Sequence, residues 1–319
     1  MKHLNRTVNG PETWMIRRCL SWLLPLYLLC AGPQVRAEGG VPFLWEVHGA
    51  KATHYLLGSV HLLPDNSEEL PQGIAEAYDA SDAVVFETDL GALSQPRVRV
   101  AMLAAARSQP GLKAEIGGKM YEQLERYSAH IGMPVSACDP FKPWFCAMTL
   151  EVFSYRKAGF SGENGIDEQI YHWALEDGKD VRWLEAPAAH IGLFTGMNGP
   201  LAREFLASAM DEQDGDSGDD PEQMLRAWRD NDVGVVEALD RQLKHGYPQV
   251  YDHLLAQRNR NWMPQLKRIF DGDEPELVVV GAAHLVGPDG LIAALRAHGY
   301  KVAPYSAVEQ QLMTMARAD

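Results

Sequence analysis

The sequence of 319 residues lacks the short motifs that identify several large enzyme classes. It contains no HExxH or HxxEH zinc-binding motif and no Gly-x-Ser-x-Gly nucleophile turn, so zincin and serine-hydrolase chemistry are not indicated. A P-loop and a GxGxxG turn are also missing, which leaves nucleotide chemistry without a binding element. If the protein is an enzyme, a metal-assisted or a His/Glu mechanism remains.

Basic residues are scarce. Lys and Arg number 29 against 43 Asp and Glu, and the formal net charge at pH 7 is −14. Residues 1–37 hold five of the basic residues and one of the acidic ones, which leaves 24 basic against 42 acidic residues in the remainder. Because an acidic surface repels phosphate backbones, we expect no sequence-independent binding of nucleic acid.

Long apolar runs are missing except for one near the N-terminus. Met15-Ile16-Arg17-Arg18 precedes an apolar run at residues 19–30, and Val35-Arg36-Ala37 follows it. A basic segment, a short apolar run and a Val-x-Ala cleavage site predict a secretory signal peptide over residues 1–37. We therefore expect the mature protein in the periplasm.

Other interpretations of this segment stay open. Met15 could be the true start of the chain. A signal anchor is an alternative, although the run is short for a membrane span and contains Pro25. A lipoprotein acylated on Cys30 is another, although Leu29 fits poorly before the acylated residue. No later stretch is long and apolar enough for a membrane span, so none is expected after signal cleavage.

The chain has only four cysteines, and Cys19 and Cys30 leave with the signal peptide. Cys138 and Cys146 remain, and they could form a disulfide in an oxidising compartment or stay as two buried free thiols. Neither belongs to a CxxC motif, so thiol redox chemistry is not the expected function.

Short apolar segments alternate with helical segments along the mature chain. This pattern predicts an α/β fold, with a central, mostly parallel sheet and helices on both faces. The predicted strands are 43–47, 54–57, 83–86, 181–184, 277–280 and 300–303. Helices are predicted over 68–80, over much of 187–270, and over 289–298.

We expect a single domain over residues 38–319 with a helix-rich insertion at about 95–180. An acidic loop at 211–220 interrupts the later helices. It lacks the spacing and the closing Glu of an EF-hand loop, so we interpret it as a solvated linker or a lid.

Two segments share one local pattern, a buried strand followed by Gly-x-x-His. The first ends in Gly58 and His61, and the second in Gly281 and His284. The glycine allows a sharp turn, and the imidazole follows at the carboxyl edge of the sheet, where open α/β sheets bind their ligands.

A third predicted strand, 83–86, is followed directly by Glu87, and the strand at 181–184 by Glu185, a weaker candidate. Two imidazoles and a carboxylate can ligate a divalent metal ion and leave positions for water and substrate. Such an ion lowers the pKa of its bound water and polarises a carbonyl group. The alternative is that each of these residues is structural.

Together with several further motifs, these residues resemble the TraB/GumN family, which includes pheromone-shutdown proteins and the Wnt-cleaving Tiki proteases. The motifs that carry the resemblance are LWEV at 44–47, YLLGSVH at 55–61, FETD at 86–89, KPW at 142–144, GID at 165–167, LE at 184–185, QRNRNWM at 257–263 and VGAAHL at 280–285. They cover nearly the whole mature chain.

The resemblance implies an α/β fold related to the erythromycin-esterase and ChaN-like proteins. It also implies a peptidase that depends on Mn²⁺ or Co²⁺, with Zn²⁺ as a further option, held by His61, His284 and Glu87. Arg258 and Asn259 match the family pattern and would stabilise and orient a developing oxyanion. The chain departs from that pattern at Gln257, where an acid is usual, and at Ala186, where a hydroxyl is usual.

We therefore expect an exported metal-dependent hydrolase that acts on a peptide or protein. Glu87 would bind the ion or serve as general base. The alternative is a non-catalytic periplasmic protein that binds a peptide, haem or a metal. A third possibility is an envelope scaffold whose site is vestigial.

Overall fold

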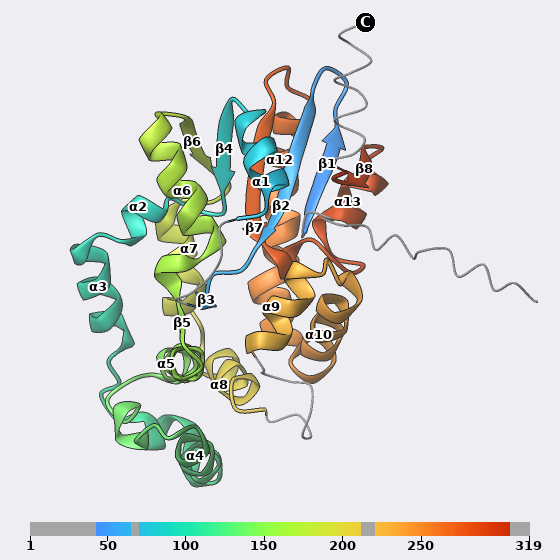
Figure 1. Ribbon diagram of the computed structural model, residues 1–319. Coiled ribbons are helices and arrows are strands. Elements are labelled where there is room, and N and C mark those ends of the chain that lie inside the picture. The colour runs from blue at the N-terminus through green and yellow to red at the C-terminus, as the bar shows by residue number, and fades with distance from the viewer. Residues whose placement is uncertain (1–42, 65–69, 212–220, 307–319) are drawn as a thin grey trace, which may run out of the picture. The chain divides into compact units, whose positions relative to one another are not determined.

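The computed structural model describes residues 43–64, 70–211 and 221–306. Figure 1 shows their arrangement. The predicted signal peptide at 1–37 and residues 212–220 of the acidic loop lie outside the described residues. Within the described residues, no helix has the length and hydropathy needed to cross a membrane.

The centre of the fold is a six-stranded sheet in the order β6-β4-β7-β2-β1-β8. Strands β6, β4, β7 and β2 run parallel, whereas β1 is antiparallel to both β2 and β8. The strands are β1 (Leu44–His48), β2 (Thr53–Ser59), β4 (Ala83–Phe86), β6 (Asp180–Trp183), β7 (Glu276–Gly281) and β8 (Lys301–Pro304). The predicted α/β class with a mostly parallel sheet is confirmed.

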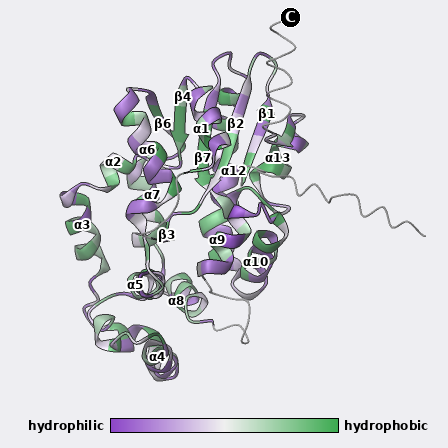
Figure 2. Ribbon diagram, viewed as in Figure 1, coloured by the Kyte–Doolittle hydropathy of each residue, from purple (hydrophilic) through white to green (hydrophobic). Residues whose placement is uncertain are grey.

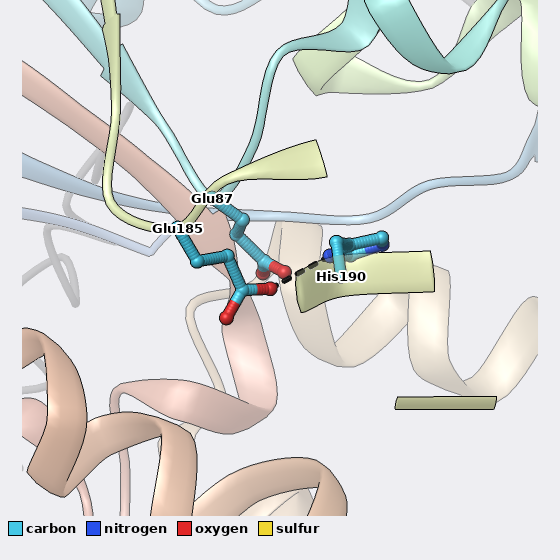
Figure 3. A group of neighbouring side chains, drawn as sticks. All are labelled: Glu87, Glu185 and His190. Carbon is cyan, nitrogen blue, oxygen red and sulfur yellow. Dashed lines mark hydrogen bonds and ion pairs between the residues drawn. The ribbon is translucent and has the colours of Figure 1, made fainter. Parts of the chain in front are cut away.

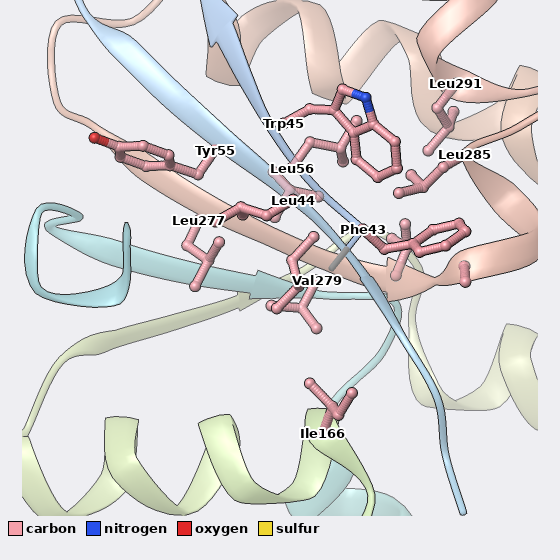
Figure 4. Packing of buried hydrophobic residues seen from close by; sticks show 14 of the residues in the cluster. Phe43, Leu44, Trp45, Tyr55, Leu56, Ile166, Leu277, Val279, Leu285 and Leu291 are labelled. Atoms are coloured by element: carbon pink, nitrogen blue, oxygen red, sulfur yellow. The ribbon is translucent and has the colours of Figure 1, made fainter. Parts of the chain in front are cut away.

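The inner strands are largely apolar, because helices cover both faces of the sheet. Every residue of β4 and β7 is buried, and these strands carry mostly hydrophobic side chains (Figure 2). Right-handed crossovers place α1 (Gln72–Asp79) and α6 (Ile166–Asp177) on one face, and α12 (Gln257–Phe270) and α13 (Leu291–Ala297) on the other. Figure 4 shows the packing between β1, β2, β7 and these layers.

A second hydrophobic cluster lies among helices away from the sheet. It includes Leu124 of α4 (Leu112–Ile131), Leu150 of α5 (Pro143–Lys157) and Phe205 of α8 (Gly199–Ser208). The helices that form this cluster do not coincide with the expected insertion at 95–180. Helix α6 packs on the sheet instead, because it connects the parallel strands β4 and β6, and α8 joins the cluster from outside the expected range.

The structure contains further helices and two short strands besides those named above. They are β3 (Leu63–Pro64) paired with β5 (Phe160–Ser161), α2 (Leu90–Leu93), α3 (Pro96–Ala106), α7 (Pro187–Thr195), α9 (Pro221–Arg229), α10 (Val233–Gly246) and α11 (Pro248–Tyr251). A π-helical turn at Asp252–Ala256 leads into α12.

The structure joins Cys138 and Cys146 in a disulfide within the second cluster, between the turn before α5 and the first turn of α5. The two residues are eight positions apart. Closing so short a loop stabilises the fold by about 2–3 kcal/mol in the chain-entropy description.

Candidate functional site

Four chemically active side chains follow the carboxyl ends of the four parallel strands. His61 follows β2, Glu87 follows β4, Glu185 follows β6 and His284 follows β7. The strands end within two residues of one another, because Ser59 pairs with Gly281, and Phe86 pairs with both Trp183 and Val279, which lies two residues before the end of β7. The sheet therefore brings residues from distant parts of the chain to one edge.

A cavity of about 450 Å³ opens at this edge. Its polar wall contains His61, Glu87, Arg258 and His284, around the backbone of Gly281. Most of the other lining residues are apolar and include Val60, Leu62, Val152, Phe194, Met224, Leu225, Leu254 and Leu255, and Ser59, Glu151 and Tyr155 lie among them. Asn259 does not line the cavity, although sequence analysis grouped it with Arg258.

His61 is held by a residue that sequence analysis did not single out. Its Nδ1 lies 3.0 Å from Oδ2 of Asp167, at the start of α6, so the carboxylate accepts the Nδ1 proton and Nε2 remains for another partner. The negative charge of Asp167 raises the pKa of His61 to about 9, against the opposing effect of burial. Its side chain is 60% exposed, unlike the rest of the polar wall.

His284 is fixed from behind by Asn259. The Asn259 Nδ2 group donates to the carbonyl oxygens of His284 and Asp289, so its Oδ1 is the acceptor for the Nδ1 proton of His284, at 2.7 Å. The Nε2 lone pair of His284 therefore faces the cavity. Burial lowers the pKa of His284 to about 4, so this imidazole is neutral at pH 7.

Arg258 links the acidic residues of the edge. Its Nη2 donates to Glu87 at 2.5 Å and to Glu185 at 2.7 Å, and its Nη1 donates to Nε2 of His284 at 3.0 Å. The guanidinium also lies over the ring of Trp262, 4.5 Å from its centroid. Because Arg258 is buried, this set of contacts is the main charge compensation for the two glutamates.

The glutamates are ionised despite their surroundings. Burial raises the pKa of Glu87, but Arg258, His284, His61 and the Gly281 N–H lower it more strongly, to well below the usual range. Burial likewise opposes the ionisation of Glu185, whose pKa is nevertheless lowered by hydrogen bonds from His190 and Arg258. Both side chains are carboxylates at neutral pH.

The described residues contain one group whose donor atoms all lie within 4.8 Å of one another, and it is Glu87, Glu185 and His190 (Figure 3). The Arg258 guanidinium bonds both of these carboxylates, so a cation already compensates this group. The predicted metal ligands His61, Glu87 and His284 are more widely spaced. His190 had no recognisable pattern in the sequence.

The predicted ligands nevertheless surround one point beside Gly281. A Cβ atom added to Gly281 would lie 3.4 Å from Oε1 of Glu87, 3.6 Å from Nε2 of His61 and 3.7 Å from Cδ2 of His284. Two oriented imidazoles and a carboxylate are a donor set that suits a divalent transition-metal ion. Three carboxylates, counting Asp167, face one guanidinium and the His61 ring, whose pKa is raised to about 9, so a net negative charge remains at this edge at pH 7.

The two motif glycines, Gly58 and Gly281, differ in how much space surrounds them, so substitution by alanine should affect stability differently at the two positions. At Gly58 an added Cβ would lie 3.0 Å from the backbone of Ala282 and 3.0 Å from Leu285. We expect Gly58→Ala to lower the free energy of unfolding by about 1–3 kcal/mol. Gly281→Ala should change it by about 0.5 kcal/mol or less, because its backbone conformation suits any residue and its contacts are ordinary. Urea titrations of both variants test this, and a loss in Gly281→Ala equal to that in Gly58→Ala would contradict it.

Comparisons with known proteins show the family to which the chain belongs. The family model described as the TraB/PrgY/gumN family matches residues 43–304, which include every residue of the polar wall. The chain is 26% identical to the proteins named "Uncharacterized protein YbaP" of Escherichia coli (strain K12) and of Shigella flexneri, over 76% of this chain and 87% of each relative. No solved structure matches. The match to the family model covers most of the chain, and the protein belongs to the TraB/PrgY/gumN family.

Proposed function

We propose that the cavity lined by His61, Glu87, Arg258 and His284, which we call the catalytic cavity, is the active site of an exported, metal-dependent hydrolase that cleaves peptide bonds. The observation that carries the proposal is the pair of imidazoles that follow β2 and β7, each with Nδ1 bonded to a side chain. Nε2 of His61 is left for a ligand beside Glu87, and Nε2 of His284 accepts only from Arg258, whose N–H a ligand would replace. A histidine whose second nitrogen is fixed in this way is typical of metal sites.

His61, His284 and Glu87 would hold the ion, which is Mn²⁺, Co²⁺ or Zn²⁺. When bound, such an ion supplies an activated water and polarises the substrate carbonyl. The strongly lowered pKa of Glu87 favours a role as ligand over a role as general base, because an efficient base has a pKa near the working pH.

Arg258 would stabilise the oxyanion. Its Nη1 now donates to Nε2 of His284. When that lone pair is given to another ligand, the N–H of Nη1 loses its acceptor and becomes available to a carbonyl oxygen in the cavity. Asn259 and Asp167 act as positioning residues, since each contacts a histidine rather than the cavity's centre.

The apolar lining residues of the catalytic cavity support a peptide as substrate. Side chains such as Phe194, Met224 and Leu254 offer contact area for an amino-acid side chain, in the same cavity as the polar groups that would act on the peptide bond. The disulfide Cys138–Cys146 supports an oxidising compartment, which agrees with export to the periplasm.

Calorimetric titration of the chain from residue 38 with Mn²⁺, Co²⁺ and Zn²⁺ tests the proposal. We expect one ion per chain, with binding weakened about 100-fold or more by His61→Ala. Gly281→Ala should have a similar effect, because its methyl group would occupy the space between the donors. His298→Ala, an exposed histidine on the far end of α13, is the matched control.

The outcomes separate the alternatives. Binding lost in His61→Ala and kept in His298→Ala, followed by metal-dependent cleavage of fluorogenic peptides, supports the hydrolase. The order of affinities does not identify the native ion, because Zn²⁺ generally binds more tightly than Mn²⁺. Absence of metal binding overturns the proposal and favours a metal-free binding protein, and a Soret band on the purified protein favours a haem carrier.

A further inference from the structure

A second cavity, of about 490 Å³, adjoins the catalytic cavity. We call it the acidic cavity. The two share a wall, because the residues Glu151, Tyr155, Met224, Leu254, Leu255 and Ala283 line both. Ala283 immediately precedes His284, so a ligand that occupies the acidic cavity lies next to the polar wall of the catalytic cavity.

The acidic cavity has charge of one sign. Glu151, Asp211 and Asp240 contribute carboxyl groups, and none of its described lining residues is Lys, Arg or His. The other lining residues are neutral, including Ser208, Gln242 and Leu243. Such a wall attracts cationic groups and repels anionic ones.

Asp240 is the feature that points to a ligand. It lies in the middle of α10, its residue is only 7% exposed, and its Oδ2 has no hydrogen-bond partner among the described residues. Burial and the like charge of Glu237 raise the pKa of Asp240 to about 7. A buried carboxyl group without a partner is costly, and a cation at this position would remove the cost.

Building on the proposed function, we propose that the acidic cavity binds a positively charged group of the substrate peptide, while the bond to be cleaved lies in the catalytic cavity. The group is an alkylammonium or a guanidinium, supplied either by the amino terminus or by a Lys or Arg side chain. Asp240 would pair with it, and the apolar residues Leu239 and Leu243 would contact the methylene groups of a side chain.

Equilibrium binding tests this without requiring turnover. The probes are fluorescein-labelled heptapeptides of alanine that carry one variable residue, which is lysine, norleucine or glutamate, at each position in turn. Each is made with a free and with an acetylated amino terminus, and binding to the chain from residue 38 is followed by fluorescence anisotropy. We expect lysine at one position, or the free terminus, to improve affinity about tenfold over its neutral counterpart.

The variants assign the effect to Asp240. Asp240→Asn keeps the shape of the side chain, and we expect it to reduce the preference to about twofold or less. Glu237→Gln, which removes the same charge one turn away outside the acidic cavity, should keep the preference. Thermal melts check that both variants are folded.

Equal affinities for lysine and norleucine peptides with either terminus, absence of binding, or a preference that survives Asp240→Asn each overturn the proposal. If peptides with a free amino terminus bind more tightly than the same peptides after acetylation, the acidic cavity binds the amino terminus. If acetylated peptides with lysine bind more tightly than acetylated peptides with norleucine, it binds a side chain. Charge-selective binding without cleavage would refute the proposed hydrolase and support the proposed role of the acidic cavity. Cleavage without charge selectivity would support the hydrolase and refute the role of the acidic cavity.

Discussion

Arg258→Met is expected to lower the free energy of unfolding by about 3–5 kcal/mol at pH 7, because it leaves two buried carboxylates without their cation. Glu87 and Glu185 each lie within 2.7 Å of the Arg258 Nη2 atom, and their side chains are only 11% and 13% exposed. Removing one partner of a buried ionic group costs far more than the group contributes as a whole.

The loss should depend on pH in a defined direction. The pKa values of Glu87 and Glu185 are lowered in the folded protein, so their contribution to stability is complete above about pH 5 and is lost as the pH falls. The difference between wild type and Arg258→Met should therefore be largest at neutral pH and shrink in acid. Urea unfolding at several pH values measures it.

Arg260→Met is the matched control on the same helix. Arg260 pairs with Asp252 at 2.8 Å, but the two side chains are 60% and 56% exposed. Such a surface pair contributes at most about 1 kcal/mol. Equal losses in Arg258→Met and Arg260→Met would show that the buried contacts of Arg258 are not what stabilises this edge of the sheet.

Asp240→Asn is expected to stabilise the protein at neutral pH, on the order of 3 kcal/mol, if no cation is bound. The expectation follows from the pKa of Asp240, which burial and Glu237 raise to about 7 from the 3.8 of an unperturbed aspartate. Tyr251, on α11, is another titratable group near Asp240, and Glu151, Asp211 and Tyr247 line the same cavity. Each unit of this shift corresponds to about 1.4 kcal/mol, and the buried amide of the variant offsets part of the gain.

The direction of the pH dependence of this stability difference follows from proton binding to Asp240. Below about pH 4 both the folded and the unfolded aspartate are protonated, so the variant gives no advantage. Between about pH 4 and pH 7 the unfolded chain releases this proton while the folded protein retains it, so wild-type stability falls and the advantage of the variant grows. Above pH 7 the advantage is constant. Urea unfolding from pH 4 to pH 8 tests this course, with the exposed Asp252→Asn as control, and a pH-independent difference would contradict it.

Sequence patterns identified the residues of the site that immediately follow strands. His61, Glu87 and His284 all come directly after apolar segments, and parallel pairing is enough to bring such positions to one edge. Their predicted role as metal ligands stays a prediction. The strands themselves agree with the predicted segments to within about two residues, since short, fully apolar runs have few other places in a fold.

Contacts from helices could not be read from the sequence. Arg258 reaches Glu87 across 171 positions, and Asp167 reaches His61 across 106, and neither separation follows from local periodicity. Sequence analysis assigned Asn259 to an oxyanion, whereas the structure places it behind His284. Asp240 carried no signal at all, because an acid within a helix is ordinarily exposed to solvent.

The strand order has a consequence for how an exported chain folds. Strand β7 lies between β2 and β4, although about 190 residues separate it from β4 and about 217 from β2 in the sequence. A chain that emerges from a membrane N-terminus first can close the short Cys138–Cys146 loop early, but β2 and β4 lack their common neighbour until residues 276–281 have arrived. The side chains at the carboxyl edge cannot come together before then, so the candidate site stays incomplete until most of the chain is available for folding.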